Sequence, residues 1–368
     1  MKRIALCFMA AALVSCKPEL QSTLGFDEVL DFKTSDTLLI SDRVVNVEYI
    51  PLELTEDSRF GRVNKVVVEN GLVYIWSYFQ PKVVVYDLSG NVEFVLDKKG
   101  RGPGEYYEIT NFAVDEENLY TVDLQQCRLY IYDCRTGSYK ESKPLPFHVS
   151  SIEVLDNGDF LLAFIPGLMG LPNNPPPTRH LIFHTDSDFN VKESLLPYDK
   201  GYGEMGKLNY FTRADGKILF SPYLFDGYVE FDSKDGKHRI VAVNLEDSMP
   251  MKDRLDMDAW NRNPRQVIHD VPLKCDGYVM MAIAQSDHYY YFHDPDSGLF
   301  LHNSYEDAHN FVMPPISSYR DKFVSFLESY EYYESFVEHG GQRMSPECEE
   351  RLKKGETVMV LSTMINRS

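Results

Sequence analysis

Apolar residues along this chain fall into short runs that end in polar turns, and one form of this pattern recurs five times. In each copy an apolar run ends in an aromatic residue with a polar neighbour, and a turn rich in Gly, Asp and Ser leads to a second apolar run. The aromatic positions are separated by 46, 51, 48 and 61 residues, and they are Tyr86, Tyr132, Phe183, Phe231 and Phe292. A repeat of this length is typical of an array of similar structural units.

The first four copies are each preceded by a second pair of apolar runs with its own turn. These pairs occupy residues 64–77, 111–123, 151–164 and 210–221, and the fifth unit begins near Cys275. Asn-Gly, Asp-Gly and Ser-Gly between β-branched or aromatic runs are hairpin signals, because these residues tolerate positive φ. Four strands per repeat joined by tight turns predict the blades of an all-β propeller.

A sixth blade can be assembled from the two ends of the chain. Its strands would come from the run at residues 323–337, the last run at 357–365 and an early segment at 43–54. Closing the ring with one strand from each end hides two sheet edges that would otherwise invite aggregation. We therefore predict a six-bladed β-propeller with ring closure by N- and C-terminal strands, with five or seven blades as the alternatives.

Composition agrees with a single β domain. Aromatic residues make up 13% of the chain, with 24 Tyr and 22 Phe, and such residues suit pleated, half-buried strands. Residues 36–368 are expected to form the propeller. One short helix is predicted after Ser345, because Ser fits an N-cap, Pro346 fits the first turn, and Gly355 ends the pattern.

The first residues have the pattern of an export signal. Lys2 and Arg3 precede an apolar run at residues 4–14, which is shorter than the roughly 20 residues of a spanning helix. The run ends in Leu13-Val14-Ser15-Cys16, which resembles a bacterial lipobox and implies cleavage before Cys16 and lipidation of its sulfur. The alternatives are an ordinary signal peptide or a buried N-terminal helix.

These features predict a signal peptide at residues 1–15, a tether at 16–35, and a location in the cell envelope. The protein would be lipid-anchored to the outer membrane, either periplasmic or surface-exposed, and would touch the membrane only through the lipid on Cys16. The formal net charge is −19, from 37 basic and 56 acidic residues. Nucleic-acid phosphates repel so acidic a protein, so no nucleic-acid partner is expected.

The sharpest local motif is Gly-rich and occupies residues 99–106. It is not a Walker loop, because no Gly-Lys-Ser/Thr opens a helix. One interpretation is a crossover between two blades, in which the glycines supply positive φ and Pro103 stiffens the turn. The other places Arg101, Glu105 and Tyr106 at a channel mouth, where they would contact a ligand.

This motif, the lipobox and the Tyr-Asp repeat turns together resemble the six-bladed β-propeller lipoproteins of Gram-negative gut bacteria, which are related to NHL-repeat propellers. The resemblance covers nearly the whole mature chain and implies the fold and the location. NHL-like propellers include lactonases and lyases with a channel metal, so the resemblance also raises a metal-dependent enzyme as an alternative function.

Candidate catalytic groups are few. Four histidines, His288, His293, His302 and His309, lie in or just after the fifth repeat. The spacing of His293 and His302 puts them on alternating strand faces, so a shared metal is not expected. No Gly-x-Ser-x-Gly elbow is present. No cofactor is predicted, and calcium or zinc is expected only under the enzyme alternative.

Two insertions are candidate contact surfaces. Leu168, Met169 and Leu171 precede a proline run that cannot join a sheet. The segment at residues 251–266 has a short helical pattern and carries Trp260, Arg262 and Arg265. Each insertion contacts a ligand or partner, or it is plain packing or a loop without a role.

The most favoured function is non-catalytic binding by a lipid-anchored extracytoplasmic propeller. Propellers present loops around a central funnel on rigid blades, which keeps the entropic cost of association low. The expected partners are an oligosaccharide, a peptide or an envelope protein. The alternatives are the metal-dependent enzyme and a structural subunit of an outer-membrane complex.

Overall fold

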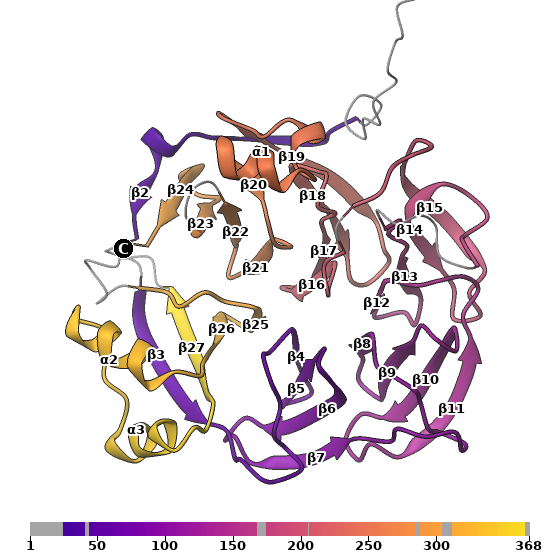
Figure 1. Cartoon of the computed structure of the whole chain (residues 1–368), viewed down its shortest axis with the longest axis horizontal. Helices are drawn as coiled ribbons and strands as arrows, with labels where there is room; N and C mark the ends of the chain where they lie inside the picture. Colours follow the sequence, from indigo (N-terminus) through magenta and orange to yellow (C-terminus); the bar gives the residue numbers. More distant parts are fainter. Residues whose placement is uncertain are drawn as a thin grey trace, which may run out of the picture.

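Six β-sheets surround a common axis in the computed structural model (Figure 1). The structure describes residues 25–40, 44–167, 174–204, 206–284, 288–303 and 311–364. The predicted all-β, six-bladed propeller is confirmed. The expected signal peptide and Cys16, as well as the apolar residues Leu168, Met169 and Leu171, lie outside the described residues.

Each of the first three blades has four antiparallel strands, which run from the axis to the rim in chain order. Blade 1 contains β4 (Lys65–Glu69), β5 (Leu72–Ser77), β6 (Gln80–Asp87) and β7 (Val92–Leu96). Blade 2 contains β8 (Asn111–Val114), β9 (Asn118–Asp123), β10 (Arg128–Asp133) and β11 (Tyr139–Pro144). Blade 3 contains β12 (Ser151–Val154), β13 (Phe160–Ala163), β14 (His180–Thr185) and β15 (Val191–Pro197).

Blades 4 to 6 add strands from the start of the chain at the rim. Blade 4 contains β16 (Phe211–Ala214), β17 (Lys217–Phe220), β18 (Gly227–Asp232), β19 (His238–Leu245) and β1 (Glu28–Phe32). Blade 5 contains β20 (Val267–Ile268), β21 (Leu273–Cys275), β22 (Tyr278–Ala284), β23 (His288–Asp294), β24 (Leu299–His302) and β2 (Leu38–Leu39). Blade 6 contains β25 (Ser317–Tyr319), β26 (Lys322–Leu327), β27 (Val358–Met364) and β3 (Val44–Pro51).

The hairpin signals of the sequence correspond to real turns. Asn70 and Gly71, which join β4 to β5, both have positive φ, at 56° and 75°, as a two-residue hairpin turn with the twist of the strands requires. The repeated aromatic residues all face packed interiors, and their side chains are at most 1% exposed. They contribute to apolar clusters that form largely between neighbouring blades.

Ring closure occurs as predicted. The last strand, β27, pairs on one side with β26 and on the other with β3, where Val360 lies opposite Tyr49. The two ends of the chain therefore share one antiparallel sheet, and neither β27 nor β26 presents a free edge.

The start of the propeller differs from the boundary expected at residue 36. Strand β1 lies within the expected tether, yet it pairs in parallel with β19, and β2 pairs in parallel with β24 (Figure 1). The physical reason is the burial of Phe32, whose ring is 1% exposed and packs edge-on against Tyr291 and Phe300 of blade 5. The N-terminal segment thus runs along the rim of blades 4 and 5 before it closes blade 6.

The helices lie at the periphery. Helix α3 (Pro346–Lys353) has the predicted cap, since the Ser345 side chain accepts a hydrogen bond from the Cys348 amide. The second half of the run expected to be strand at residues 323–337 is instead α2 (Tyr330–Glu338), which buries Tyr333 and Phe336 at helical spacing after the N-cap Ser329. No helix in the described ranges is long and apolar enough to cross a membrane.

Candidate functional site

Two adjoining cavities follow the axis of the ring, between the innermost strands. We call the first the turn-side cavity, because it reaches the hairpin turns at Asn70, Asp215 and Arg320 where innermost strands end. We call the second the loop-side cavity, because it lies where innermost strands begin, after the connections between blades. Thr212, Leu273 and other residues line both, so the cavities share walls.

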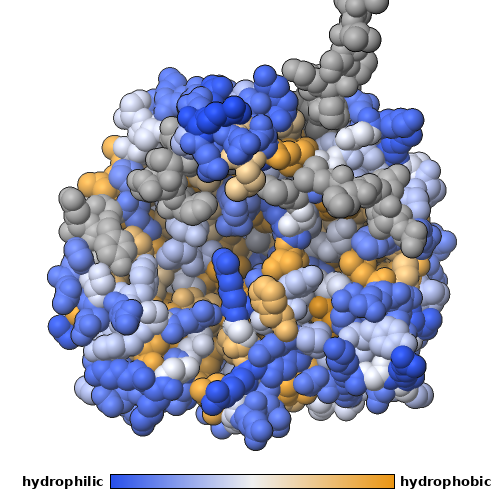
Figure 2. All heavy atoms as spheres, viewed as in Figure 1, coloured by the Kyte–Doolittle hydropathy of each residue, from blue (hydrophilic) through white to orange (hydrophobic). Residues whose placement is uncertain are grey.

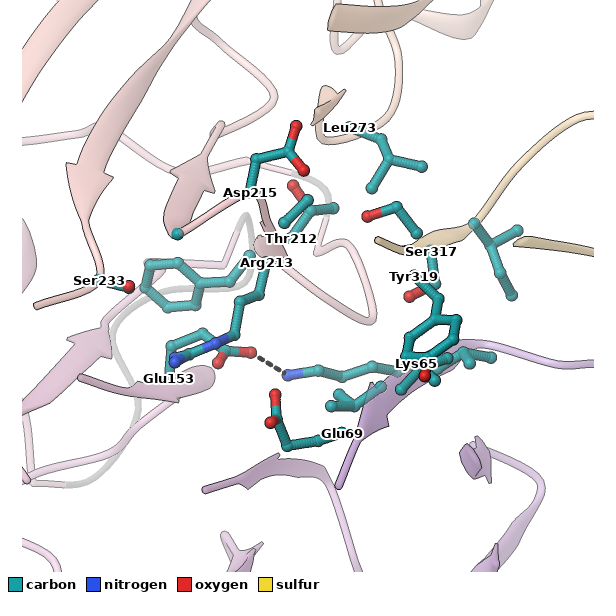
Figure 3. Close-up of a pocket in the computed structure, with 18 of the residues that line it drawn as sticks. Lys65, Glu69, Glu153, Thr212, Arg213, Asp215, Ser233, Leu273, Ser317 and Tyr319 are labelled. Carbon is teal, nitrogen blue, oxygen red and sulfur yellow. Dashed lines mark hydrogen bonds and ion pairs between the residues drawn. The ribbon is translucent and has the colours of Figure 1, made fainter. Parts of the chain in front are cut away.

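A buried lysine crosses the wall of the turn-side cavity, which has a volume of about 370 Å³ (Figure 3). Lys65 begins β4 of blade 1, and its Nζ lies 3.0 Å from Oε1 of Glu153 on β12 of blade 3. The same ammonium donates to the Phe112 carbonyl at 2.6 Å and to the Asn111 side chain at 3.2 Å. Both charged side chains are at most 3% exposed, and burial lowers the pKa of Lys65 while Glu153 opposes that shift.

Asn111 extends this network around the ring. Its Oδ1 also accepts from the Ile152 amide at 3.3 Å, and its Nδ2 donates to the Leu208 carbonyl at 3.3 Å. Leu208 directly precedes blade 4, so hydrogen bonds at the axis join blades 1 to 4. These contacts satisfy polar groups that would be costly to bury alone.

Two further charges of the turn-side cavity also form an ion pair. Arg213 of β16 forms an ion pair with Asp156 of the β12–β13 turn, and Ser233 donates to the other oxygen of that carboxylate at 2.7 Å. Glu69 lies near both, and burial raises its pKa while Arg213 opposes the shift. The two ion pairs of this cavity therefore join blade 3 to blades 1 and 4, whereas Asp215 and Arg320 line the cavity outside these pairs.

The loop-side cavity has a different lining. Its volume is about 520 Å³, and its walls combine apolar residues, such as Met280, Pro314 and Pro315, with polar ones, such as Asn209 and Thr212. Leu208 and Ile316 remain 36% and 37% exposed there. On the face seen in Figure 2, where α1 lies toward the viewer in Figure 1, apolar groups reach the surface near the centre of a mostly hydrophilic ring.

Two cations line this cavity without an ion pair to any residue that the structure describes. Arg62 is exposed and forms no ion pair or hydrogen bond with any other described residue. Lys207 donates to the Ser221 carbonyl at 3.3 Å and forms no ion pair within the described part of the chain. Desolvation lowers the pKa of Lys207 to about 8, against the opposing effects of Glu204 and Asp270.

A buried carboxyl group, that of Glu204, lies next to the loop that carries Lys207. Glu204 is 1% exposed and accepts hydrogen bonds from the Tyr202 hydroxyl at 2.8 Å and from the Leu224 amide at 3.2 Å. Burial raises its pKa. The Tyr210 hydroxyl accepts from the Lys207 amide at 2.8 Å. The hydrogen bond from the Lys207 amide to Tyr210 thus helps to fix the position of Lys207 at the cavity.

An exposed aromatic pair lies next to the loop-side cavity. Tyr78 and Phe79 form the β5–β6 turn, are 50% and 77% exposed, and have rings 5.5 Å apart in an edge-on arrangement. The Tyr78 amide donates to Oδ1 of Asn64 at 2.9 Å, and Asn64 lines the cavity. This pair was not among the predicted site residues, although two adjacent aromatic residues in a turn are a usable signal, because the inward and outward alternation of strands does not apply there.

The Gly-rich motif lies between the outer strand of blade 1 and blade 2, away from both cavities. Tyr106 is fully buried and its hydroxyl donates to the Leu96 carbonyl at 3.0 Å. The Glu105 carboxylate accepts from the Gly102 amide at 2.7 Å. Arg101 stacks over the Tyr107 ring at 5.8 Å. Contact of these residues with a ligand stays a prediction; none of them lines the loop-side or turn-side cavity.

The residues predicted in the second insertion are together on one short segment. Helix α1 (Met257–Arg262) carries Trp260, whose ring nitrogen donates to the Arg254 carbonyl at 3.3 Å. Arg262 is exposed and 3.8 Å from Asp256, and Arg265 donates to Asp247 at 2.6 Å. Figure 1 places α1 over the outer part of blades 4 and 5 and not over the centre of the ring. Their predicted role in binding is untested.

The fifth-blade histidines do not assemble with other ligands within the described residues. His293 packs against Phe300, and burial lowers its pKa. The Nδ1 of His302 donates to the Asn303 carbonyl at 3.0 Å, and His309 lies outside the described residues. In the described ranges no group of three His, Cys, Asp or Glu could hold a metal ion.

Comparison with known proteins gives a fold relative of the same size. The chain is 13% identical to a Bacteroides fragilis protein of known crystal structure that is described as exported, with a TM-score of 0.72 over 92% of this chain and 99% of that one. A member of the DUF4221 family from Bacteroides vulgatus is 10% identical over 88% of this chain and 98% of that one, with a TM-score of 0.47. At 13% identity, the similarity to the Bacteroides fragilis protein shows a common fold and no more. The similarity to the DUF4221 protein is too weak to support any conclusion. No curated protein matches the chain significantly.

A family model matches nearly the whole propeller. The match extends over residues 26–359, from the segment that contains β1 into β27, and its description is a domain of unknown function, DUF4934. The matched span includes every blade and all of the residues that line the two cavities. The chain therefore belongs to the DUF4934 family.

Proposed function

We propose that this protein is a non-catalytic, lipid-anchored propeller of the cell envelope that binds an oligosaccharide, a peptide or a partner protein at the loop-side opening of its channel. One observation carries the proposal: the loop-side cavity presents the exposed apolar side chains of Leu208 and Ile316 beside Arg62, which has no ion pair or hydrogen bond among the described residues. At the turn-side cavity, by contrast, the central charges form the ion pairs Lys65–Glu153 and Arg213–Asp156. A cavity of about 520 Å³ is within the range of ligand sites.

The rigidity of the ring supports a binding role. The Lys65–Glu153 ion pair and the hydrogen bonds of Asn111 connect innermost strands next to the cavity. A preformed site loses little conformational entropy when a ligand binds, so more of the contact energy remains as affinity. The exposed Tyr78 and Phe79 extend the surface beyond the cavity, and exposed aromatic residues are common anchors of protein interfaces.

The export signal and the lipobox before Cys16 support location in the envelope, as does the exported Bacteroides fragilis protein of similar fold. Strand β1 begins at Glu28 on the rim of blade 4. About twelve residues between Cys16 and β1 would span at most roughly 40 Å when extended. The anchor would thus hold the ring close to the membrane surface.

Thermal unfolding of residues 17–368 with panels of oligosaccharides and peptides tests the proposal. A ligand at 100 times its Kd adds about 2.7 kcal/mol to the free energy of unfolding. The shift should be lost in Leu208→Asp and Ile316→Asp and retained in the control Leu299→Asp, since Leu299 is 36% exposed but lies on the rim strand β24. Chelator, calcium and zinc are the further arms: a shift with metal alone would favour the enzyme alternative.

A further inference from the structure

We infer that the loop-side cavity accepts a carboxylate-bearing peptide, with an apolar side chain against its aliphatic wall and the carboxylate beside Arg62 and Lys207. This inference rests on the proposed function, because it names the ligand class of the same cavity. The carboxylate can be the C-terminus of the peptide or the side chain of an Asp or Glu. The protein itself carries a net charge of −19, so two cations at an apolar opening are a local departure from its overall charge.

Two cations from different blades line the cavity. Arg62 follows Gly61 on the segment that leads into β4, and Lys207 lies on the loop that leads into β16, so the two come from blades 1 and 4 of the ring. The guanidinium of Arg62 has five donors and no acceptor among the described residues. A planar carboxylate matches the fork of a guanidinium. The cavity thus offers unused donors where a carboxylate could sit.

Two acidic groups, Glu204 and Asp270, lie close enough to interact with the Lys207 ammonium. Asp270 is the acidic residue in the lining, and its Oδ1 lies 3.3 Å from Nδ1 of His269. Glu204 lies near Lys207 with its carboxyl group buried, and burial raises the pKa of that group. In an apolar setting a charge interaction is stronger than it is in water. An incoming anion would therefore be held more firmly here than at an open surface.

The aliphatic walls favour a peptide over a sugar. Leu208, Ile316 and Met280 supply side chains without polar groups, and Pro314 and Pro315 add rigid apolar surface. Sugar rings bring many hydroxyl groups, which this aliphatic side of the lining would leave without partners on burial, although Asn209 and Thr212 offer polar groups elsewhere in the cavity. An apolar amino-acid side chain has no hydrogen bonds to lose, and its burial against this wall is favourable because it removes apolar surface from water.

One donor in the lining also fits a peptide backbone. The Oδ1 of Asn64 accepts from the Tyr78 amide at 2.9 Å, which fixes the orientation of the side chain. No described residue accepts a hydrogen bond from its side-chain NH₂ group. A peptide carbonyl placed along the cavity wall could accept one. The exposed rings of Tyr78 and Phe79 would then contact the residues of the peptide that remain outside.

A hexapeptide library on the mature chain tests the inference. The last three positions are randomised, and each peptide is made once with a free C-terminal carboxylate and once as the amide. Binding to residues 17–368 is followed by fluorescence anisotropy. We expect a free-acid peptide with an apolar residue near its end to bind, and loss of its carboxylate to weaken binding roughly tenfold or more.

Variants link binding to the cations. Arg62→Gln and Lys207→Gln should each weaken the selected peptide by a similar factor. The control Arg59→Gln removes the same charge from an exposed arginine that does not line the cavity, and it should leave the affinity unchanged. Circular dichroism of each variant confirms folding. If the amide and the acid bind alike but Asp or Glu in the peptide is required, the side-chain carboxylate is the ligand and the inference holds.

Other results would overturn the inference while leaving the proposed function in place. These are peptide binding that ignores every carboxylate, peptide binding unaffected by Arg62→Gln and Lys207→Gln, and binding of oligosaccharides but of no peptide. If neither class nor any envelope protein binds, and Leu208→Asp and Ile316→Asp have no effect on any interaction, the proposed function fails as well.

Discussion

The Nζ of Lys65 and Oε1 of Glu153 lie 3.0 Å apart, although one residue belongs to blade 1 and the other to blade 3. The ion pair passes across the start of blade 2, where Asn111 and Phe112 also accept from the ammonium. The 88 residues of separation in the chain become one contact at the axis of the ring. Both residues line the turn-side cavity, and Asn111 connects them by a hydrogen bond to Leu208, which lines the loop-side cavity.

Removing one partner of this pair should be costly. Lys65→Met leaves the Glu153 carboxylate buried and uncompensated, and breaking such a pair costs about 3–5 kcal/mol. The double variant Lys65→Met/Glu153→Met should lose less than either single variant, because no unpaired charge remains. Thermal unfolding of the three variants checks this expectation. The control Lys237→Met, in an ion pair with Asp235 at the surface, should leave the melting temperature unchanged; a double variant less stable than both singles would contradict the interpretation.

The Gly-rich motif should respond as a packing element. Gly104 has φ of 76°, and a Cβ there would lie 2.5 Å from the Tyr139 ring. Gly104→Ala should therefore destabilise the protein by about 1 kcal/mol from backbone strain and further through the clash. Gly158→Ala is the matched control, since φ is 84° and the space around it is open. Equal losses of melting temperature in the two variants would mean that the clash is absent.

The features set by local sequence could be predicted, because each depends on neighbours in the chain. Asn-Gly and Asp-Gly turns defined the hairpins, and the spacing of Tyr86, Tyr132 and Phe183 defined the blades. Closure by β3 and β27 followed from the requirement that a ring has no free edge. Helix α3 was signalled by its own cap at Ser345.

Features that depend on distant contacts could not be predicted. Strand β1 is held by burial of Phe32 against Tyr291 and Phe300, more than 250 residues away. Tyr-rich residues 330–338 read as strand by composition, yet their helical burial of Tyr333 and Phe336 requires partners from elsewhere. Arg62 and Lys207 come together at one cavity only after the ring closes. The sequence around Arg62 and the sequence around Lys207 contain no pattern that would pair these two residues at one site.

Binding of a carboxylate peptide at the loop-side cavity should depend on pH. Below about pH 8 the Lys207 ammonium is charged, and above it the amine becomes neutral. Affinity should be high at pH 7 and fall as the pH rises through about 8, by up to about tenfold per unit if the charge is essential. Glu204 and Asp270 face the same region and act on the Lys207 ammonium.

The control for this prediction is Lys207→Arg, which keeps the charge and removes the titration. Its affinity should be flat between pH 7 and 9, as measured by anisotropy with the selected peptide. An identical fall in both proteins would assign the pH dependence to another group. The stability of the peptide-free protein should change with pH in the opposite direction. Desolvation of the Lys207 ammonium lowers the free energy of unfolding below about pH 8, and this penalty disappears as the pH rises from about 8 toward the ordinary lysine value of 10.5.

The exposed pair Tyr78 and Phe79 should contribute to affinity and not to stability. At 50% and 77% exposure their rings bury little surface in the free protein, so Tyr78→Ser and Phe79→Ser should change the melting temperature little. Each ring would be covered by the part of a bound peptide or partner protein outside the cavity, and loss of an aromatic anchor typically weakens binding by about 1–2 kcal/mol or more. The affinity of the selected peptide and of any co-purified envelope protein provides the measurement. Val191→Ser is the matched control, because Val191 is 45% exposed on the rim strand β15. If Val191→Ser weakens binding as much as Phe79→Ser, the contact surface lies at the rim and not around the channel.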